Sequence, residues 1–150
     1  SIFAMASGEI GTHIYNNTRH AIFSGIITYD DIGSAVRKKV IEGEIPTNEE
    51  KYIKQRIEGL IANPAIRPWF EKGNIVFNEA SILLPDSATK RPDRVILKDG
   101  KVIIIDFKFG VENPRYQLQV RQYRNILEKM DYCVSEAYLW FVDSDKIVPV

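Results

Sequence analysis

The sequence predicts a layered α/β (α+β) fold, in which a helical N-terminal segment precedes a mixed sheet of about four to five strands flanked by helices. Apolar residues recur at helical spacing through residues 1–73, whereas from residue 74 they form short extended runs separated by turn residues. The order of helices, three strands, a helix and a further strand is typical of an α/β layer on a largely antiparallel sheet. The 150 residues contain no repeat or linker, so we expect one domain, 1–150.

The N-terminal part is expected to be helical. Three helices and a short turn are predicted, over about 7–25, 30–43, 47–63 and 65–70. Ser7 is a candidate cap for the first helix. Thr47 and Glu50 have the three-residue spacing of a capping box at the start of the third helix, and Asn63-Pro64 stops that helix.

The C-terminal part is expected to contain the sheet and one more helix. Strands are predicted over 75–84, on both sides of a turn at Asp99-Gly100, over 134–142 and over 146–150. The helix is expected to start at Asn113 as cap and Pro114 as first residue, and to end near residue 130. A stripe of apolar and aromatic residues on this helix is expected to face the core: Tyr116, Val120, Tyr123, Leu127 and Met130.

The hairpin around Asp99-Gly100 carries the most informative pattern in the chain. A two-residue loop of this type, between two apolar runs, predicts a register in which Asp93 lies opposite Asp106. Because side chains alternate along a strand, Lys108 shares the face of Asp106 while Phe107 points away. Like charges directly opposed across a sheet are destabilising, so this placement predicts a cation between the two carboxylates.

Three segments of this part resemble one enzyme superfamily. They are Arg91–Val95, Ile104–Lys108, and the helix-face pattern Tyr116-x-x-Gln119-x-x-x-Tyr123. Together they resemble the PD-(D/E)XK nucleases, and within these the RecB-like group, which furnishes the C-terminal nuclease domains of AddAB- and RecBCD-type helicase-nucleases. The resemblance extends over nearly the whole chain.

The resemblance implies a restriction-endonuclease-like core over 74–150, after a helical part over 1–73. It also implies a hydrolase: a Mg²⁺-dependent deoxyribonuclease (exonuclease V-like) that degrades linear DNA ends during DNA repair and recombination, with single-stranded DNA as a product. The expected partners are DNA, a helicase domain in the same polypeptide and a partner subunit. No Walker A loop occurs in the sequence, so a motor would lie elsewhere in a longer polypeptide, of which this chain, beginning at Ser1, is expected to be a fragment.

The roles of the hairpin residues follow from the resemblance. Asp93 and Asp106, helped by the main-chain carbonyl of Phe107, are implied to hold Mg²⁺ or Mn²⁺, ions that prefer oxygen ligands. Lys108 is implied to orient or deprotonate the attacking water and to offset charge on the scissile phosphate. The alternative is a pair of surface carboxylates at strand ends, with Lys108 in an ordinary salt bridge.

Further residues are implied around these. Glu79 would be another acidic residue of the site, and Gln119 with Tyr123 would position the DNA backbone. Each also fits an ordinary role. Glu79 would then lie on a solvated strand face, Gln119 on a polar helix face and Tyr123 in the core. Three arginines on the same helix are candidate phosphate contacts or simply a solvated face: Arg115, Arg121 and Arg124.

One position departs from the family pattern. The RecB-like group usually has a histidine metal ligand in a Gly-Thr-x-x-His context, and here Tyr15 stands at that place. His13 lies two residues earlier, about 200° around a helix, so it does not simply substitute. Both are therefore secondary metal candidates only. This departure supports an alternative function, a catalytically impaired DNA-binding or scaffold module with the same fold.

Composition excludes several other classes. The single cysteine, Cys133, rules out a disulfide framework within the chain and a cysteine-ligated zinc or iron–sulfur site, which argues against a CRISPR-type adaptation nuclease of the same superfamily. Cys133 is expected to be a small buried residue. No run of about 18 apolar residues and no secretory signal occur, so we expect no membrane partner and a cytoplasmic location. The net charge of zero argues against an unselective basic coat for nucleic acid.

Overall fold

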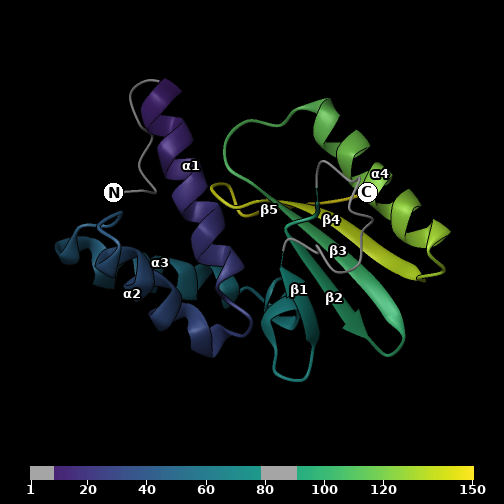
Figure 1. Ribbon diagram of the computed structural model, residues 1–150, viewed down its shortest axis with the longest axis horizontal. Helices are drawn as coiled ribbons and strands as arrows, with labels where there is room; N and C mark the ends of the chain where they lie inside the picture. The colour runs from purple at the N-terminus through teal and green to yellow at the C-terminus, as the bar shows by residue number, and fades with distance from the viewer. Residues whose placement is uncertain (1–8, 79–90) are drawn as a thin grey trace. The chain divides into compact units, whose positions relative to one another are not determined.

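The computed structural model describes residues 9–78 and 91–150, with side chains described from residue 16 onward. The chain is α+β, with helices first and a mixed five-stranded sheet after them, as predicted (Figure 1). It divides into two compact units, Ser1–Lys72 and Gly73–Val150. This division falls one residue before the predicted change from the helical part to the core. That the two units form one domain stays a prediction.

Over residues 9–72, the helical unit has three α-helices, joined and followed by short 3₁₀ turns. These elements are α1 (Glu9–Ser24), η1 (Tyr29–Asp31), α2 (Ile32–Ile41), η2 (Thr47–Glu49), α3 (Glu50–Ile61) and η3 (Arg67–Phe70). The apolar residues that recur at helical spacing, such as Val36, Ile53 and Ile57, are fully buried, and Trp69 and Phe70 in the last turn are buried too. The predicted helices and the inward-packed turn are thus confirmed, whereas Ser7, the predicted cap of the first helix, lies outside the described residues.

The predicted capping box at Thr47 and Glu50 is wrong. Thr47 opens a 3₁₀ turn, and the Glu50 carboxylate accepts a hydrogen bond from Arg37 Nη1 of α2 at 2.9 Å, so it does not fold back on the backbone. A capping box occurs instead at Thr28 and Asp31, where Asp31 Oδ2 accepts from the Thr28 backbone N–H at 2.9 Å. Thr28 and Asp31 have the same three-residue spacing, with aspartate in place of glutamate.

The second unit is built on a sheet in which strand order follows chain order. The strands are β1 (Ile75–Asn78), β2 (Arg94–Lys98), β3 (Lys101–Lys108), β4 (Val134–Phe141) and β5 (Lys146–Pro149). Neighbours are antiparallel except β3 and β4, which are parallel and are joined through α4 (Pro114–Lys129). Parallel neighbours require such a crossover. Of the predicted first strand, residues 79–84 lie outside the described residues.

The hairpin between β2 and β3 has the predicted register. Lys98 pairs with Lys101 and Arg94 with Ile105. The loop residues Asp99 and Gly100 have φ values of 53° and 74°, the left-handed conformation that a two-residue turn of this kind requires. Continuing this register by one residue places position 93 opposite position 106.

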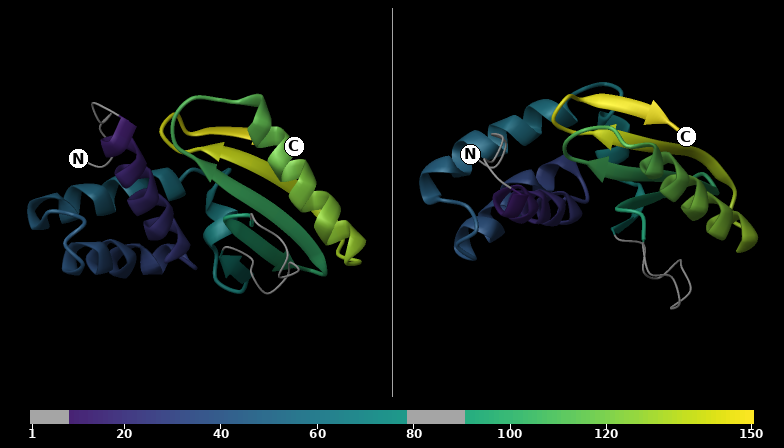
Figure 2. Two further views of the ribbon diagram at one scale, coloured as in Figure 1. Left: turned by 45° about the horizontal axis from the view of Figure 1, so that its top comes forward. Right: turned by 90° about the horizontal axis from the view of Figure 1, so that it is seen from above.

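One face of the sheet packs against α4 (Figure 2). α4 begins as predicted, since Asn113 Oδ1 accepts a hydrogen bond from the Arg115 N–H at 3.0 Å. Its buried residues meet apolar side chains of β2, β3 and β4 in one cluster: Val120, Tyr123, Leu127, Val95, Val102, Ile104, Ala137, Leu139 and Phe141. Burial of this cluster therefore fixes α4 over β3 and β4.

Two predictions about this region are wrong. Met130, expected on the buried stripe, is 41% exposed because it caps the C-terminus of α4, where the chain turns away. Cys133, expected to be buried, is exposed because it lies in the connection between α4 and β4. None of the helices in the described part of the chain is both long and apolar enough to cross a membrane.

Candidate active site

A row of apolar side chains on β3 ends in two charged residues. Val102 and Ile104 point into the cluster beneath α4 and are fully buried. Because side chains alternate along a strand, Asp106 and Lys108 continue the same row on the same face. The sequence of β3 therefore carries a carboxylate and an ammonium to the edge of the core, below the first turns of α4.

The second carboxylate comes from the residue before β2. Asp93 Oδ2 accepts a hydrogen bond from the Phe107 N–H at 2.8 Å, and the Asp93 N–H donates to Asp106 Oδ1 at 3.4 Å. The two carboxyl groups are thus neighbours, as the hairpin register predicts. The Phe107 side chain lies on the opposite face, where its ring meets that of Trp140 edge-to-face at 5.8 Å.

The Asp106 carboxyl group is in an unfavourable place for a negative charge. It is 3% exposed, and burial, followed by the nearby Asp93 carboxylate, raises its pKa from 3.8 to about 7. Lys108 acts in the opposite direction, with Nζ 2.9 Å from Asp106 Oδ2. The ion pair lacks the geometry of a hydrogen bond, and this buried oxygen accepts none from the described residues. Additional positive charge beside Oδ2 would stabilise the ionised form.

The Lys108 ammonium is held from two elements. Besides the ion pair with Asp106 on its own strand, Nζ donates a hydrogen bond to Gln119 Oε1 of α4 at 3.0 Å. It also lies 4.4 Å from the centre of the Tyr116 ring, one turn earlier on the same helix. The first turns of α4 therefore supply both a polar acceptor and an aromatic face to this lysine.

Tyr123 lies one turn beyond Gln119 on α4. Its side chain is 3% exposed and belongs to the apolar cluster, so the prediction of a core role is confirmed. Burial, and then the charges of Asp106 and Asp93, raise the pKa of its hydroxyl. The phenol is therefore neutral at physiological pH and borders the carboxylate pair from the core side.

The structure does not describe the side chains of the other acidic and N-terminal candidates. Glu79 lies outside the described residues, as do the side chains of His13 and Tyr15, whose backbone belongs to α1. Their predicted parts in a metal site stay predictions. The structure thus brings together Asp93, Asp106, Lys108, Gln119 and Tyr123 of the predicted residues, with the backbone of Phe107.

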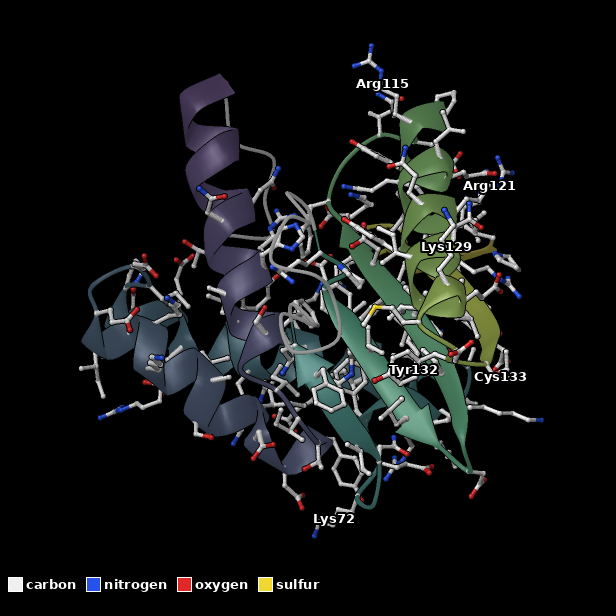
Figure 3. The ribbon with its side chains drawn as sticks, turned by 45° about the vertical axis from the view of Figure 1, so that its right-hand side comes forward. Lys72, Arg115, Arg121, Lys129, Tyr132 and Cys133 are labelled. Atoms are coloured by element: carbon white, nitrogen blue, oxygen red, sulfur yellow. The ribbon has the colours of Figure 1, made fainter. Side chains whose placement is uncertain are left out.

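The three arginines of α4 differ from one another. Arg115 and Arg121 are exposed: Figure 3 shows Arg115 projecting beyond the first turn of α4 and Arg121 projecting from the side of the helix. Arg124 is only partly exposed and donates hydrogen bonds to the main-chain oxygens of Val134, at 3.1 Å, and Val150, at 3.2 Å. Arg124 therefore joins α4 to β4 and to the end of the chain. Its predicted DNA contact would have to compete with these bonds.

Replacing Arg124 with methionine is expected to lower the free energy of unfolding by about 1–2 kcal/mol. The change leaves two partly buried carbonyl groups without their charged donor while keeping the apolar stem. Urea unfolding of the purified protein measures this. Arg115→Met is the matched control on the exposed side and is expected to change stability by less than about 0.5 kcal/mol. Equal losses of unfolding free energy in both variants would contradict a stabilising role specific to Arg124.

A cleft of about 470 Å³ lies elsewhere on this unit, beside β4 and β5. Its lining includes Leu118 and Arg121 from α4, and Phe141 from β4. Neither carboxylate of the pair lines it, and Lys108 does not. The candidate active site is therefore the charged cluster at the end of β3.

The donor set of the cluster fits a hard divalent cation. Among the described residues, no group of three or more histidine, cysteine, aspartate or glutamate side chains converges, so the carboxylate pair stands without a third such ligand there. Mg²⁺ is commonly bound by one or two carboxylates and otherwise keeps water or substrate phosphate oxygens. The buried Asp106 Oδ2, which accepts no hydrogen bond from the part of the chain that the structure describes, is an oxygen of the required kind.

Sequence reasoning missed one residue of the cluster. Tyr116 was expected on the core stripe and in the helix-face pattern of the resemblance, with no role of its own in the site, whereas its ring lies against the Lys108 ammonium. Its three-residue spacing from Gln119, which puts both on one helix face, is a signal that could have indicated this.

No protein-family model matches the chain, and a search of curated proteins finds no significant relative.

Proposed function

We propose that this chain is a metal-dependent DNA nuclease domain of the RecB-like type, which hydrolyses phosphodiester bonds. The observation that supports it is the convergence of two carboxylates and one ammonium at the end of β3. Asp93 and Asp106 are neighbours, and Lys108 Nζ lies 2.9 Å from Asp106 Oδ2. Two adjacent carboxylates, one of them buried, are costly for a fold that has no cation to hold.

Asp93 and Asp106 would hold Mg²⁺ or Mn²⁺, and a metal so bound lowers the pKa of a coordinated water and offsets phosphate charge. The Phe107 N–H donates a hydrogen bond to Asp93 Oδ2. The Phe107 carbonyl points to the same edge of β3 as this N–H, so it would be a further oxygen ligand for the metal.

The chain's own residues have distinct tasks in this proposal. Lys108 donates hydrogen bonds to a non-bridging phosphate oxygen or to the attacking water, where negative charge develops during hydrolysis. Gln119 keeps the ammonium directed toward the carboxylates through its 3.0 Å hydrogen bond. Tyr123 closes the core side of the cluster with a neutral hydroxyl, which keeps bulk water away from Asp106.

The substrate and partners follow from the resemblance of the motif segments. We infer that linear DNA ends are the substrate, with exonuclease-type cleavage during double-strand-break processing. A helicase domain in the same polypeptide and a partner subunit would deliver the unwound strand. The exposed Arg115 and Arg121 side chains of α4 would contact phosphates of the strand (Figure 3).

The proposal is tested by incubating the purified domain with end-labelled linear single-stranded DNA and Mg²⁺ or Mn²⁺. We expect cleavage that EDTA stops and that Asp106→Ala abolishes, because the variant loses the buried carboxylate that the metal needs. Circular single-stranded DNA is the control for dependence on ends. Metal-independent cleavage, or equal cleavage by the variant, would contradict the proposal.

The second candidate function is a DNA-binding or scaffold module without nuclease activity. It is favoured by Tyr15 at the usual histidine position and by the lack of a third acidic or histidine ligand among the described residues. Calorimetric titration with Mn²⁺ separates the two, since no binding at millimolar metal would favour the scaffold. A gain of cleavage in Tyr15→His, from an inactive parent, would do the same.

A further inference from the structure

We propose that Tyr116 is a positioning residue for Lys108. The face of the Tyr116 ring holds the Lys108 ammonium in the orientation that phosphodiester hydrolysis needs. This inference rests on the proposed nuclease function and adds to it a residue to which the motif comparison gives no role. The supporting observation is that Lys108 Nζ lies 4.4 Å from the centre of the Tyr116 ring. That distance is within the range of a cation–π interaction.

The Tyr116 ring is itself held in place. It packs against the Phe141 ring with centroids 6.3 Å apart and an interplanar angle of 43°. Phe141 on β4 is the register neighbour of Lys108 on β3, so both side chains lie next to each other on the face that α4 covers. Phe141 is 3% exposed, so its ring is a buried surface against which the Tyr116 ring packs.

Tyr116 and Gln119 act on Lys108 from one helix face. They are three residues apart in the first turns of α4, which the Asn113 cap and Pro114 anchor. Gln119 Oε1 and Asp106 Oδ2 lie 3.0 and 2.9 Å from Nζ. Among the described residues, the ammonium is therefore in contact with two side-chain oxygens and with the Tyr116 ring face.

Lysine needs such support more than most catalytic side chains do. Its four-carbon stem has several rotatable bonds, and holding it in one rotamer costs conformational entropy. A single hydrogen bond donated to Gln119 Oε1 leaves rotation about that bond free. A ring face against the ammonium restricts the rotation of the lysine side chain. The ring does not take up the N–H group that Lys108 would donate to the phosphate or the water.

A purely structural role for Tyr116 makes a different prediction. If the ring only filled space against Phe141, any apolar side chain of similar size would serve equally well. If the ring holds the cation, its electron density decides the effect, because fluorine atoms on an aromatic ring withdraw charge from its face and weaken cation binding.

The experiment measures kcat and KM for cleavage of single-stranded DNA by the whole 150-residue chain and its variants. Tyr116→Phe is expected to match the parent, whereas Tyr116→Leu is expected to lower kcat about 2- to 30-fold, with KM nearly unchanged. Fluorinated phenylalanines placed at position 116 are expected to lower kcat step by step as fluorine atoms are added.

Tyr132→Leu is the matched control. Tyr132 packs against the same apolar cluster but lies beyond the other end of α4 (Figure 3). Its replacement is expected to lower stability without changing kcat. An NMR readout independent of activity is the Lys108 Cε–H signal, which the ring current of Tyr116 shifts upfield and which Tyr116→Leu returns toward its ordinary position.

The outcomes separate this inference from the function on which it rests. A parent without metal-dependent cleavage overturns the nuclease function and this inference with it. An active parent with an unchanged kcat in Tyr116→Leu, or an equal kcat across the fluorinated series, overturns the role of Tyr116 alone. A graded loss of kcat together with the lost upfield shift supports it.

Discussion

Replacing Lys108 with methionine is expected to lower the rate of DNA cleavage by about 100- to 1,000-fold. The Lys108 ammonium contacts the carboxylate pair, with Nζ 2.9 Å from Asp106 Oδ2. Removing one preorganised donor to a developing negative charge has a cost of this order. Methionine keeps the length and apolar stem of lysine, so the fold is expected to remain.

Single-turnover cleavage at saturating Mg²⁺ measures this loss. Lys101→Met is the matched control, because Lys101 is an exposed lysine at the other end of the same strand. We expect parent-like rates in the control and a normal circular dichroism spectrum in both variants. If Lys108→Met retained the parental rate, the ammonium would have no part in the chemistry and the assignment of the site to a nuclease would fail.

Replacing Asp106 with asparagine is expected to stabilise the metal-free protein by up to about 4 kcal/mol at pH 8. Burial and the Asp93 carboxylate raise the pKa of Asp106 from 3.8 to about 7, so at pH 8 the folded state carries a charge that it accommodates badly. Asparagine is nearly isosteric with the neutral carboxyl group. It removes the charge and leaves the packing unchanged.

The dependence on pH has a defined direction. A carboxyl group with a raised pKa binds its proton more tightly in the folded state, so stability falls as pH rises from about 4 to about 7 and is level above that range. The gain from Asp106→Asn is therefore expected to be small at pH 4.5 and full at pH 8. Urea unfolding in EDTA at the two pH values measures it. An equal gain at both would contradict the raised pKa.

The same pair of proteins reports on metal binding. At pH 8, a concentration of Mg²⁺ tenfold above its dissociation constant is expected to stabilise the parent by about 1.4 kcal/mol. Asp106→Asn is expected to gain much less, because it lacks a carboxylate ligand. Metal is thus expected to narrow the difference in stability between the two proteins by up to about 1.4 kcal/mol.

The hairpin at the centre of the site could be predicted from local sequence alone. Asp99 and Gly100 tolerate the left-handed backbone that a two-residue turn needs, and this turn fixes which residues pair across β2 and β3. The alternation of side chains then places Asp106 and Lys108 on one face. Turn chemistry and strand periodicity are short-range rules, so they apply before any tertiary contact forms.

Other features depended on which atoms meet in space. The capping box was expected at Thr47 but occurs at Thr28. Glu50, the expected partner of Thr47, instead accepts a hydrogen bond from Arg37 of another helix. Likewise, Arg124 resembled a surface arginine in the sequence but binds two main-chain oxygens far along the chain. Competition between partners that are distant in sequence cannot be read from spacing.

The sequence by itself determined the order of elements, the hairpin register and the neighbouring positions of Asp93 and Asp106, because these follow from periodicity and turn geometry. Only the tertiary structure decided the depth of Asp106 in the core, the direction of its pKa and the attachment of Lys108 to Gln119 and Tyr116. Those properties arise where α4 crosses the end of β3. Desolvation and cation–π contact depend on this packing, which local sequence does not encode.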